Sequence, residues 1–334
     1  MKFAIVGCQH YHIKTFIDDM IREGHSFAGI YDPDGFPLAQ QYAVTYGVPT
    51  LSSLEEVLDQ GVSVIGSAGP NPGKIDVVEW AERHDIHVMT DKPIVIDENG
   101  VRRLRAVIDR KRIKLGMMLT ARFAPAQYTL KRMIDDGELG EIEDFTFLKP
   151  HKLHPATRPG WFFDKSLNGG LIVDLMIHDV DMLWWFTGKS IVGHHALLVK
   201  NRFPEYPGLY ENAIVNVLLE DHITATMKSD WLMPEAFESW GDGRILVTGT
   251  KGRAEIRTSG DPLGEPGPFL AFTDHVNKTR RVDILKPPAS LTADFLAQIA
   301  GQPHRLTADD VCRANAMVVR IDGASTKLNS MSLE

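Results

Sequence analysis

Three side chains in the middle of the chain have the types and the spacing that proton chemistry needs: Asp174, His178 and Asp181. They lie in residues 169–188, GGLIVDLMIHDVDMLWWFTG, which we predict to form one helix ended by Gly188. Residues four and three positions apart share one face of a helix, so these three would form a polar stripe on an otherwise apolar element. Because buried charge is costly unless it is paired, the stripe indicates either a catalytic group or core residues that satisfy one another.

His178 is the predicted proton-transfer residue. Imidazoles titrate near neutral pH, which suits a general base or a general acid. Asp174 could orient this imidazole or bind a substrate hydroxyl, and Asp181 is assigned to structure. Metal ligation by His151, His154, Asp174 and His178 is the weaker alternative, because no tight ligand spacing links them, and we predict no metal site.

The composition describes the setting in which these residues act. With 334 residues, of which 43% are hydrophobic and 24% charged, the chain is typical of a globular protein with two domains. The net charge of −8 and the lack of a basic run argue against a nucleic-acid partner. Two distant cysteines, Cys8 and Cys312, predict no disulfide and a cytoplasmic location. We expect neither a signal peptide, since the chain opens directly into a strand pattern, nor a membrane span, since no long apolar stretch occurs.

The first half alternates short apolar runs with helical patterns, which is typical of a doubly wound parallel sheet. Gly7, Asp32, residues 69–71 and residues 91–93 each follow an expected strand. Ligands bind at the carboxyl ends of the strands in such a sheet, so we expect the ligand of this domain there. The expected strands are residues 2–7, 27–31, 62–65, 86–90 and 113–118, and the expected helices are residues 13–23, 38–46, 54–58, 75–84 and 98–111.

The pattern changes after about residue 121, where several strands follow one another without long helices between them. This order favours an antiparallel sheet and an α+β second domain. Residues 150–160 are expected to form a loop. The expected strands are residues 142–148, 196–200, 213–219, 223–231, 243–247 and 253–257, and the expected helices besides 169–188 are residues 125–136, 291–300 and 307–327.

Six stretches together resemble the family of glucose–fructose oxidoreductase and inositol 2-dehydrogenase, Gfo/Idh/MocA. They are, in order, KFAIVG, YDPD, HVMTDKPI, ARFAPAQYTLKRMIDDGELGEIEDF, GGLIVDLMIHDVDMLWWFTG and VTGTKGRAEI, and they span nearly the whole chain. The resemblance implies a dinucleotide-binding Rossmann domain over residues 1–120 and an α+β domain with a large, mostly antiparallel open sheet over residues 121–334. It also implies an NAD(P)-dependent oxidoreductase of a sugar, cyclitol or related polyol, and a homodimer or homotetramer formed through the C-terminal sheet.

The expected dinucleotide loop, residues 7–12 (GCQHYH), keeps only the first glycine of the G-x-G-x-x-G pattern. Amides at a helix N-terminus could still bind phosphate, with Gln9 or His10 as further donors, and the alternative is a turn that binds nothing. Asp32 suits the adenosine ribose hydroxyls and would repel a 2′-phosphate, which favours NAD over NADP. The alternative for Asp32 is a turn residue before Pro33.

The resemblance places Lys92, in TDKPI, beside the nicotinamide and the substrate hydroxyl. A cationic amine there would stabilise a developing alkoxide and relay its proton. Two departures from the family pattern lie nearby: Asp91 replaces a glutamate, and Lys74 stands in the segment where the family often has a histidine. The expected cofactor edge also includes Gly69, Pro70, Asn71 and Pro93.

The expected substrate residues flank residues 169–188. Aromatic rings stack on sugar faces and cations bind carboxylates, so these residue types suit the polyol pocket that the resemblance implies. Ordinary packing or a solvated loop is the alternative for each residue. The candidates are Arg122, His151, Arg158 and Trp161.

Together these observations predict an NAD-dependent oxidoreductase centred on Lys92, Asp174 and His178. Two other functions fit the same residues. A dinucleotide-binding sensor without turnover is favoured by the altered glycine loop and by Lys74. An enzyme that keeps its cofactor bound could instead use transient oxidation to drive elimination or hydrolysis.

Overall fold

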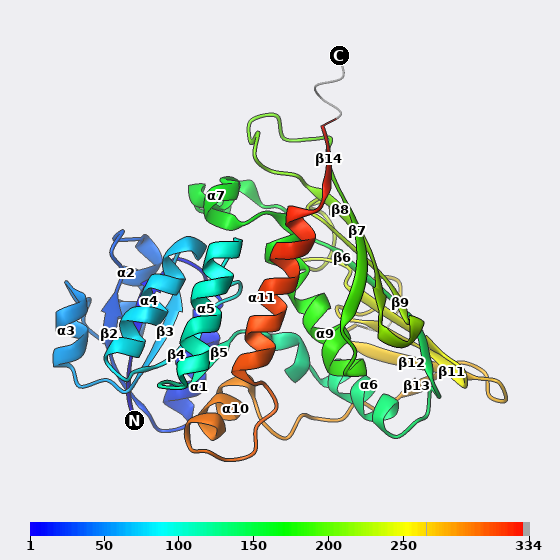
Figure 1. Ribbon diagram of the computed structural model, residues 1–334, viewed down its shortest axis with the longest axis horizontal. Helices are drawn as coiled ribbons and strands as arrows, with labels where there is room; N and C mark the ends of the chain where they lie inside the picture. Colours follow the sequence, from blue (N-terminus) through cyan, green and yellow to red (C-terminus); the bar gives the residue numbers. More distant parts are fainter. Residues whose placement is uncertain (265, 330–334) are drawn as a thin grey trace. The chain divides into compact units, whose positions relative to one another are not determined.

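The computed structural model describes residues 1–264 and 266–329, which form two compact units (Figure 1). The first unit contains residues 1–119, 159–169 and 289–316. The second unit contains residues 120–158, 170–288 and the chain from residue 317 onward. Within the described residues, no helix combines the length and the apolar composition that crossing a membrane requires.

The first unit is a doubly wound sheet, as predicted. Its five strands are all parallel and lie in the order β2-β1-β3-β4-β5. The strands are β1 (Lys2–Cys8), β2 (Ser26–Tyr31), β3 (Val64–Ala68), β4 (His87–Thr90) and β5 (Leu115–Met117). The helices are α1 (Ile13–Arg22), α2 (Pro37–Tyr46), α3 (Leu54–Asp59), α4 (Asn71–Arg83), α5 (Glu98–Arg110), α7 (Lys165–Asn168), α10 (Leu291–Ile299) and the first half of α11 (Ala308–Gly323), with a 3₁₀ turn at Gly160–Phe163.

The core of this unit follows from the spacing of apolar residues in α1. Ile13, Phe16, Ile17 and Met20 recur at helical intervals and are all buried. They pack in one cluster with β1 and α2, and Phe295 of α10 joins the same cluster. The chain therefore returns to the first core almost 300 residues after it left β1.

One boundary in this unit differs from the prediction and affects the candidate site. β3 runs on to Ala68 and α4 begins at Asn71, whereas the predicted strand ended at residue 65 and the predicted helix began at residue 75. Pro72 lies in the first turn of α4, a position where proline is favoured because its missing N–H would have no helical partner. Gly69 and Pro70 are thus the whole connection between β3 and α4.

The second unit is built on a nine-stranded sheet in the order β13-β12-β11-β10-β6-β9-β8-β7-β14 (Figure 1). The sheet is mostly antiparallel, as predicted, with parallel pairing only of β6 with β9 and of β7 with β14 among the described strands. The strands are β6 (Ile142–Pro150), β7 (Ile191–Lys200), β8 (Asn212–Leu219), β9 (Thr224–Asp230), β10 (Arg244–Gly249), β11 (Gly252–Arg257), β12 (Phe269–Asp274), β13 (Arg280–Val282) and β14 (Thr326–Asn329). The helices are α6 (Pro125–Asp135), α8 (Leu171–Leu175) and α9 (Ile177–Thr187), with 3₁₀ turns at Thr120–Phe123, Pro155–Thr157 and Glu220–His222.

Three strands of this sheet were not predicted. β12 and β13 follow a glycine- and proline-rich loop, after which no strand was predicted. The prediction of a helix from residue 307 to residue 327 was wrong at its end, because α11 ends at Gly323 and Thr326–Asn329 pairs with β7. Backbone pairing with a neighbouring strand decides the conformation of so short a segment, and local sequence does not encode it.

One face of the sheet is buried and the other is exposed. β8 alternates strictly between buried and exposed residues, and α8 packs against β8 and β9. Ile214 and Leu218 of β8 are 37% and 39% exposed. The exposed face therefore carries apolar side chains as well as polar ones.

The helix predicted over residues 169–188 is broken, and this is the main correction to the fold. α8 ends at Leu175 and α9 begins at Ile177, with Met176 between them at φ −80° and ψ −4°. The N–H groups of Asp179 and Val180 both donate to the Met176 carbonyl, at 2.9 and 3.0 Å. The Leu175 carbonyl thereby loses the helical partner that Asp179 would have supplied.

Candidate functional site

The loop after β1 begins with a close approach of two backbones. Gly7 has φ +79°, and a Cβ atom at this position would lie 3.0 Å from Gly69 N and 3.1 Å from Gly69 Cα. Any other residue would combine a strained backbone with this contact. Gly7 and Gly69, two predicted cofactor residues, therefore lie side by side at the carboxyl ends of β1 and β3.

Asp32 ties the end of β2 to this loop. Its Oδ2 accepts a hydrogen bond from Cys8 N at 2.6 Å, and its Oδ1 accepts from Asp34 N and Phe36 N at 3.1 and 3.2 Å. Gln9 is buried, and its Nε2 donates to Asp34 Oδ2 at 2.5 Å. The turn that the sequence analysis offered as the alternative for Asp32 is present, and the Gln9 side chain points toward that turn.

Two imidazoles converge on one buried carboxylate. His12 Nδ1 hydrogen bonds to Asp91 Oδ1 at 3.0 Å, and His10 Nδ1 lies 2.8 Å from Asp91 Oδ2. The two imidazole rings are 4.2 Å apart and edge to face. The three residues come from the loop after β1 and from the end of β4, which the sheet places next to β3.

The protonation of this group follows from its burial and its charges. Burial lowers the pKa of His10 to about 4, although the nearby Asp91 carboxylate opposes this shift. Burial alone would raise the pKa of Asp91, but the fields of His10, His12 and Lys74 hold it well below its usual range. At neutral pH we therefore assign a charged Asp91 and a neutral His10.

Lys74 lies in the candidate site, and the sequence analysis did not predict its contacts. It is 2% exposed, and its Nζ donates to Asn71 Oδ1, to the Asp91 carbonyl and to the Pro93 carbonyl at 2.9, 3.1 and 3.0 Å. These hydrogen bonds of a buried ammonium hold the backbone on both sides of Lys92 in place. The positional contrast with the family's histidine was a signal, but it did not show what the lysine contacts.

Lys92 and Asn71 are held by the same network. Lys92 is 7% exposed, its peptide bond to Pro93 is cis, and its backbone N–H donates to Asp91 Oδ1 at 2.8 Å. Asn71 Nδ2 donates to the Asn168 carbonyl at 2.7 Å, which joins the start of α4 to the end of α7. The first unit thus collects the predicted cofactor residues at one edge of its sheet: Gly7, Gln9, His10, Asp32, Gly69, Pro70, Asn71, Lys92 and Pro93.

In the second unit, Asp174 and His178 lie on either side of the helix break. Asp174 is in α8 and is 8% exposed, and His178 is in the first turn of α9 and is partly exposed. They therefore do not belong to one continuous helix, which the sequence analysis had predicted. Their relative position depends on the junction at Met176.

Lys149 of β6 secures that junction. Its Nζ donates to the Leu175 carbonyl at 3.0 Å and to Asp179 Oδ1 at 2.5 Å. The first contact satisfies the carbonyl that the helix break leaves without its helical partner. Asp179 is fully buried, and burial raises the pKa of its carboxyl above the ordinary value while the Lys149 ammonium opposes that shift.

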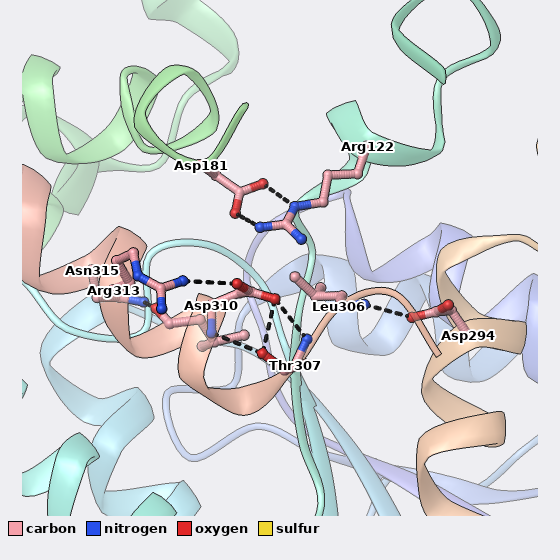
Figure 2. A network of polar contacts seen from close by, with 9 residues as sticks. Arg122, Asp181, Asp294, Leu306, Thr307, Asp310, Arg313 and Asn315 are labelled. Carbon is pink, nitrogen blue, oxygen red and sulfur yellow. Dashed lines mark hydrogen bonds and ion pairs between the residues drawn. The ribbon is translucent and has the colours of Figure 1, made fainter. Parts of the chain in front are cut away.

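Arg122 and Asp181 form a second buried ion pair, shown in Figure 2. The Arg122 Nε and Nη2 atoms lie 2.8 and 2.5 Å from the two Asp181 oxygens, and both residues are 2% exposed. This bidentate contact fits the structural role that we predicted for Asp181. The predicted role of Arg122 as a substrate residue would have to use the part of the guanidinium that Asp181 does not engage.

The other predicted substrate residues fall into two groups. His151 and Arg158 belong to the second unit, where Arg158 Cζ lies 4.5 Å from the Trp231 ring and 5.3 Å from the Trp240 ring. His151 packs edge to face on the same two rings. The sequence analysis did not name these two tryptophans as candidate substrate residues. Trp161 belongs to the first unit, and its buried indole Nε1 has no hydrogen-bond partner among the described residues, so it is able to donate to a ligand.

Comparison with known proteins identifies the family. Residues 1–118 match the sequence model of the oxidoreductase family with an NAD-binding Rossmann fold, GFO/IDH/MocA, and residues 128–255 match the model of the C-terminal domain of the same family. The chain belongs to the Gfo/Idh/MocA family. Both halves of the predicted resemblance are confirmed.

The relatives within the Gfo/Idh/MocA family include cyclitol dehydrogenases. An inositol 2-dehydrogenase of Rhizobium meliloti is 30% identical over 226 residues, which cover 66% of this chain and 64% of that protein. A scyllo-inositol 2-dehydrogenase (NAD(+)) of Bacillus subtilis is 24% identical, over 75% of this chain and 70% of its own length. The structure of an aldose-aldose oxidoreductase from Caulobacter crescentus, complexed with glycerol, has a TM-score of 0.81 at 19% identity and covers 97% of each chain, which supports the fold.

Proposed function

We propose that this member of the Gfo/Idh/MocA family is an NAD-dependent dehydrogenase that transfers a hydride between nicotinamide and a hydroxyl or carbonyl carbon of a cyclitol, sugar or related polyol. The observation that carries the proposal is the fixed Lys92, held by Asp91 and Lys74 at the carboxyl edge of a sheet that matches the family's NAD-binding model. The names of the inositol dehydrogenases support a cyclitol or another polyol as the substrate.

The residues at this edge fit a dinucleotide. Gly7 and Gly69 bring the backbones at the ends of β1 and β3 into close contact, and Asp91, Lys74 and Lys92, which lie at the same edge of the sheet or contact residues there, together carry one net positive charge. A net positive charge at the carboxyl end of parallel strands suits a diphosphate. Asp32 lies at the same edge, where it could accept the adenosine ribose hydroxyls and would repel a 2′-phosphate, which supports NAD rather than NADP.

In the proposed reaction, one protein side chain would transfer the proton and another would stabilise the developing negative charge. When bound, NAD supplies the hydride acceptor. His178 accepts the proton of the substrate hydroxyl during oxidation and returns it during reduction. The Lys92 ammonium donates to the same oxygen and stabilises its developing negative charge, while Asp174 orients the imidazole or binds a neighbouring hydroxyl.

The two domains and the assembly have proposed roles. Residues 1–120 would hold the cofactor, and residues 121–334 would supply the substrate site and the surface between subunits. The apolar side chains on the exposed face of β8 support a homodimer or homotetramer formed through this sheet. Trp161, with an indole N–H able to donate, and the Trp231–Arg158–Trp240 stack supply the aromatic and cationic groups that polyol recognition uses.

Two measurements on the full chain test this function. NADH should raise the melting temperature more than NADPH, because a ligand of the folded state stabilises it by mass action. Myo-inositol, scyllo-inositol and aldoses should then be screened for reduction of NAD by the absorbance of the product. No thermal shift with either dinucleotide would contradict the redox function, and a shift with NADPH alone would contradict the role of Asp32.

A further inference from the structure

The dinucleotide loop of this chain has lost two glycines and gained two histidines, and the structure joins both histidines to one carboxylate. Resting on the proposed function, we infer that His12, held by Asp91 and backed by His10, is the group that binds the diphosphate of the dinucleotide, and that it binds in its protonated form. An imidazole side chain would thus replace the fixed backbone contacts that a glycine-rich loop provides.

At this position the backbone amides supply little to an anion, so a side chain would have to bind it. His12 is the residue before α1, where a dinucleotide-binding loop ordinarily offers free amides to phosphate. Here the N–H groups of Ile13, Lys14 and Thr15 donate to the carbonyls of His10, Tyr11 and His12, at 3.4, 3.0 and 3.1 Å. Because these amides are already engaged, the helix start alone supplies less to an anion than the family pattern would.

Asp91 determines which nitrogen of His12 is available. The hydrogen bond at 3.0 Å engages His12 Nδ1 as the donor to the carboxylate. Nε2 is then the atom that is left to carry a second proton, and a doubly protonated imidazole donates a charge-assisted hydrogen bond. The His12 side chain is 32% exposed, whereas that of Asp91 is 3% exposed, so a ligand has access to the imidazole and not to its anchor.

The charges around the pair favour an anion over a cation. His12 contacts Asp91 and packs against the rings of His10 and Tyr11 in its own loop. The fields of two ammonium groups act on the same cluster, that of Lys92 on His10 and that of Lys74 on Asp91. With His10 neutral, one carboxylate and two ammonium groups leave a net positive charge before any ligand binds. His10, His12 and Asp91 do offer three donor atoms within 4.8 Å of one another, a spacing that a metal ion could use, but a divalent cation would add to this positive charge.

The role of His10 differs from that of His12. It is more deeply buried, and burial lowers its pKa to about 4, so it remains neutral at the pH where dinucleotides are used. It packs edge to face on His12 at 4.2 Å and contacts the other Asp91 oxygen at 2.8 Å. His10 is thus a positioning residue for the carboxylate, and His12 is the residue that takes up the proton.

The test is the affinity for NADH at pH 6 and pH 8, with calorimetry in two buffers of different ionisation enthalpy to count the protons taken up. The wild-type chain should bind about fivefold more weakly at pH 8 and should take up a fraction of a proton on binding. His12→Ala should bind roughly 10- to 100-fold more weakly at pH 6 and lose the pH dependence. His12→Gln, which keeps a neutral donor, should bind with intermediate affinity and without proton uptake.

Lys14→Ala is the matched control, because Lys14 is an exposed cation of the same helix that pairs with Asp18. It should keep the wild-type pH dependence. NADH affinity and proton uptake in His12→Ala that equal those of the wild type would overturn the inference and leave the proposed function intact. Proton uptake that persists in His12→Gln would overturn it in the same way.

Inorganic pyrophosphate, inorganic phosphate and Zn²⁺, each offered alone, separate the remaining cases. Pyrophosphate binding that depends on His12 supports the inference even if the chain binds no NADH, in which case only the proposed function fails. Absence of binding to both NADH and pyrophosphate overturns both. A preference for inorganic phosphate over pyrophosphate, or tight Zn²⁺ binding that Asp91→Asn abolishes without any binding of pyrophosphate, contradicts the assignment of a diphosphate site.

Discussion

Two buried carboxylates, Asp181 in the second unit and Asp91 in the first, are almost equally hidden from water and have opposite kinds of partners. Asp181 accepts two hydrogen bonds from the Arg122 guanidinium, which stays charged at every pH that a protein experiences (Figure 2). Asp91 contacts two imidazoles, His10 and His12, and lies near two lysines.

The difference separates a fixed structural pair from an adjustable one. A bidentate pair with a guanidinium holds one geometry, and nothing in it responds to a ligand or to pH. An imidazole that donates to a carboxylate can take up a second proton when an anion approaches. The adjustable contacts, those of Asp91, therefore lie in the first unit. The fixed pair, Arg122 and Asp181, lies in the second unit, and Asp181 belongs to the helix that carries His178. Four substitutions test this difference.

Arg122→Leu should have the largest effect. It leaves Asp181 as an uncompensated charge in a dry site, so we expect a loss of about 3–5 kcal/mol in the free energy of unfolding, measured by denaturant titration. The double variant Arg122→Leu/Asp181→Leu should recover most of this loss, because it removes both charges. A loss below about 1 kcal/mol in the single variant would show that the pair is not structural.

Lys149→Met is the intermediate case. It leaves the Leu175 carbonyl without the Lys149 donor and Asp179 without its cation, so we expect a loss of about 2–3 kcal/mol at neutral pH. A buried acid with a raised pKa binds a proton more readily when folded, so its destabilising effect is absent at acidic pH and grows as pH rises through that pKa. The loss should therefore shrink toward acidic pH, and Lys149→Met/Asp179→Leu should remove the pH dependence.

Asp91→Asn should cost about 1–3 kcal/mol at neutral pH, because the two imidazoles lose their charged acceptor. The sign of its pH dependence is opposite to that of Lys149→Met. A depressed carboxyl pKa contributes stability that is complete above the unfolded value near 4 and is lost as pH falls through the folded value. The difference between wild type and Asp91→Asn should thus narrow below about pH 4, and a constant difference down to pH 2 would contradict a charged Asp91.

Thr307→Ala should have the smallest effect and sets the lower limit of the series. Thr307 Oγ1 accepts from Asp310 N at 3.1 Å, and Asp310 Oδ2 accepts from Thr307 N at 3.0 Å, so the two residues close the start of α11 reciprocally (Figure 2). Loss of this cap should cost about 1 kcal/mol. Thr307→Ser, which keeps the hydroxyl, should be nearly neutral, and an equal loss in both variants would contradict the capping role.

The fold was predictable where local pattern decides it. The alternation of strand and helix patterns predicted the parallel sheet of the first unit, and that sheet is present. The family and the sheet type of the second domain were also confirmed. The break at Met176 was not predicted, and the donor that satisfies its Leu175 carbonyl is a lysine on β6, 26 residues away in sequence.

The site was predictable to the level of residue types and not of contacts. Lys92 and the cofactor edge could be placed by strand ends and by family resemblance, and their roles stay predictions. The hydrogen bonds that Lys74 donates could not be predicted from the sequence, because its acceptors are two backbone carbonyls and an asparagine. Asn315 illustrates the same limit, because its side chain accepts the N–H groups of Ile94 and Val95 from more than 200 residues away.

A double-mutant cycle on kcat/KM for polyol-dependent reduction of NAD, with Lys92→Met and His178→Ala, shows whether the ammonium and the imidazole act on the same substrate oxygen. If both side chains act on the same substrate oxygen, each single variant loses about a hundredfold or more, and the double variant loses far less than the product of the two. NADH affinity measured beside it shows that the cofactor still binds. Losses that multiply, or near-normal turnover of His178→Ala, would contradict the account.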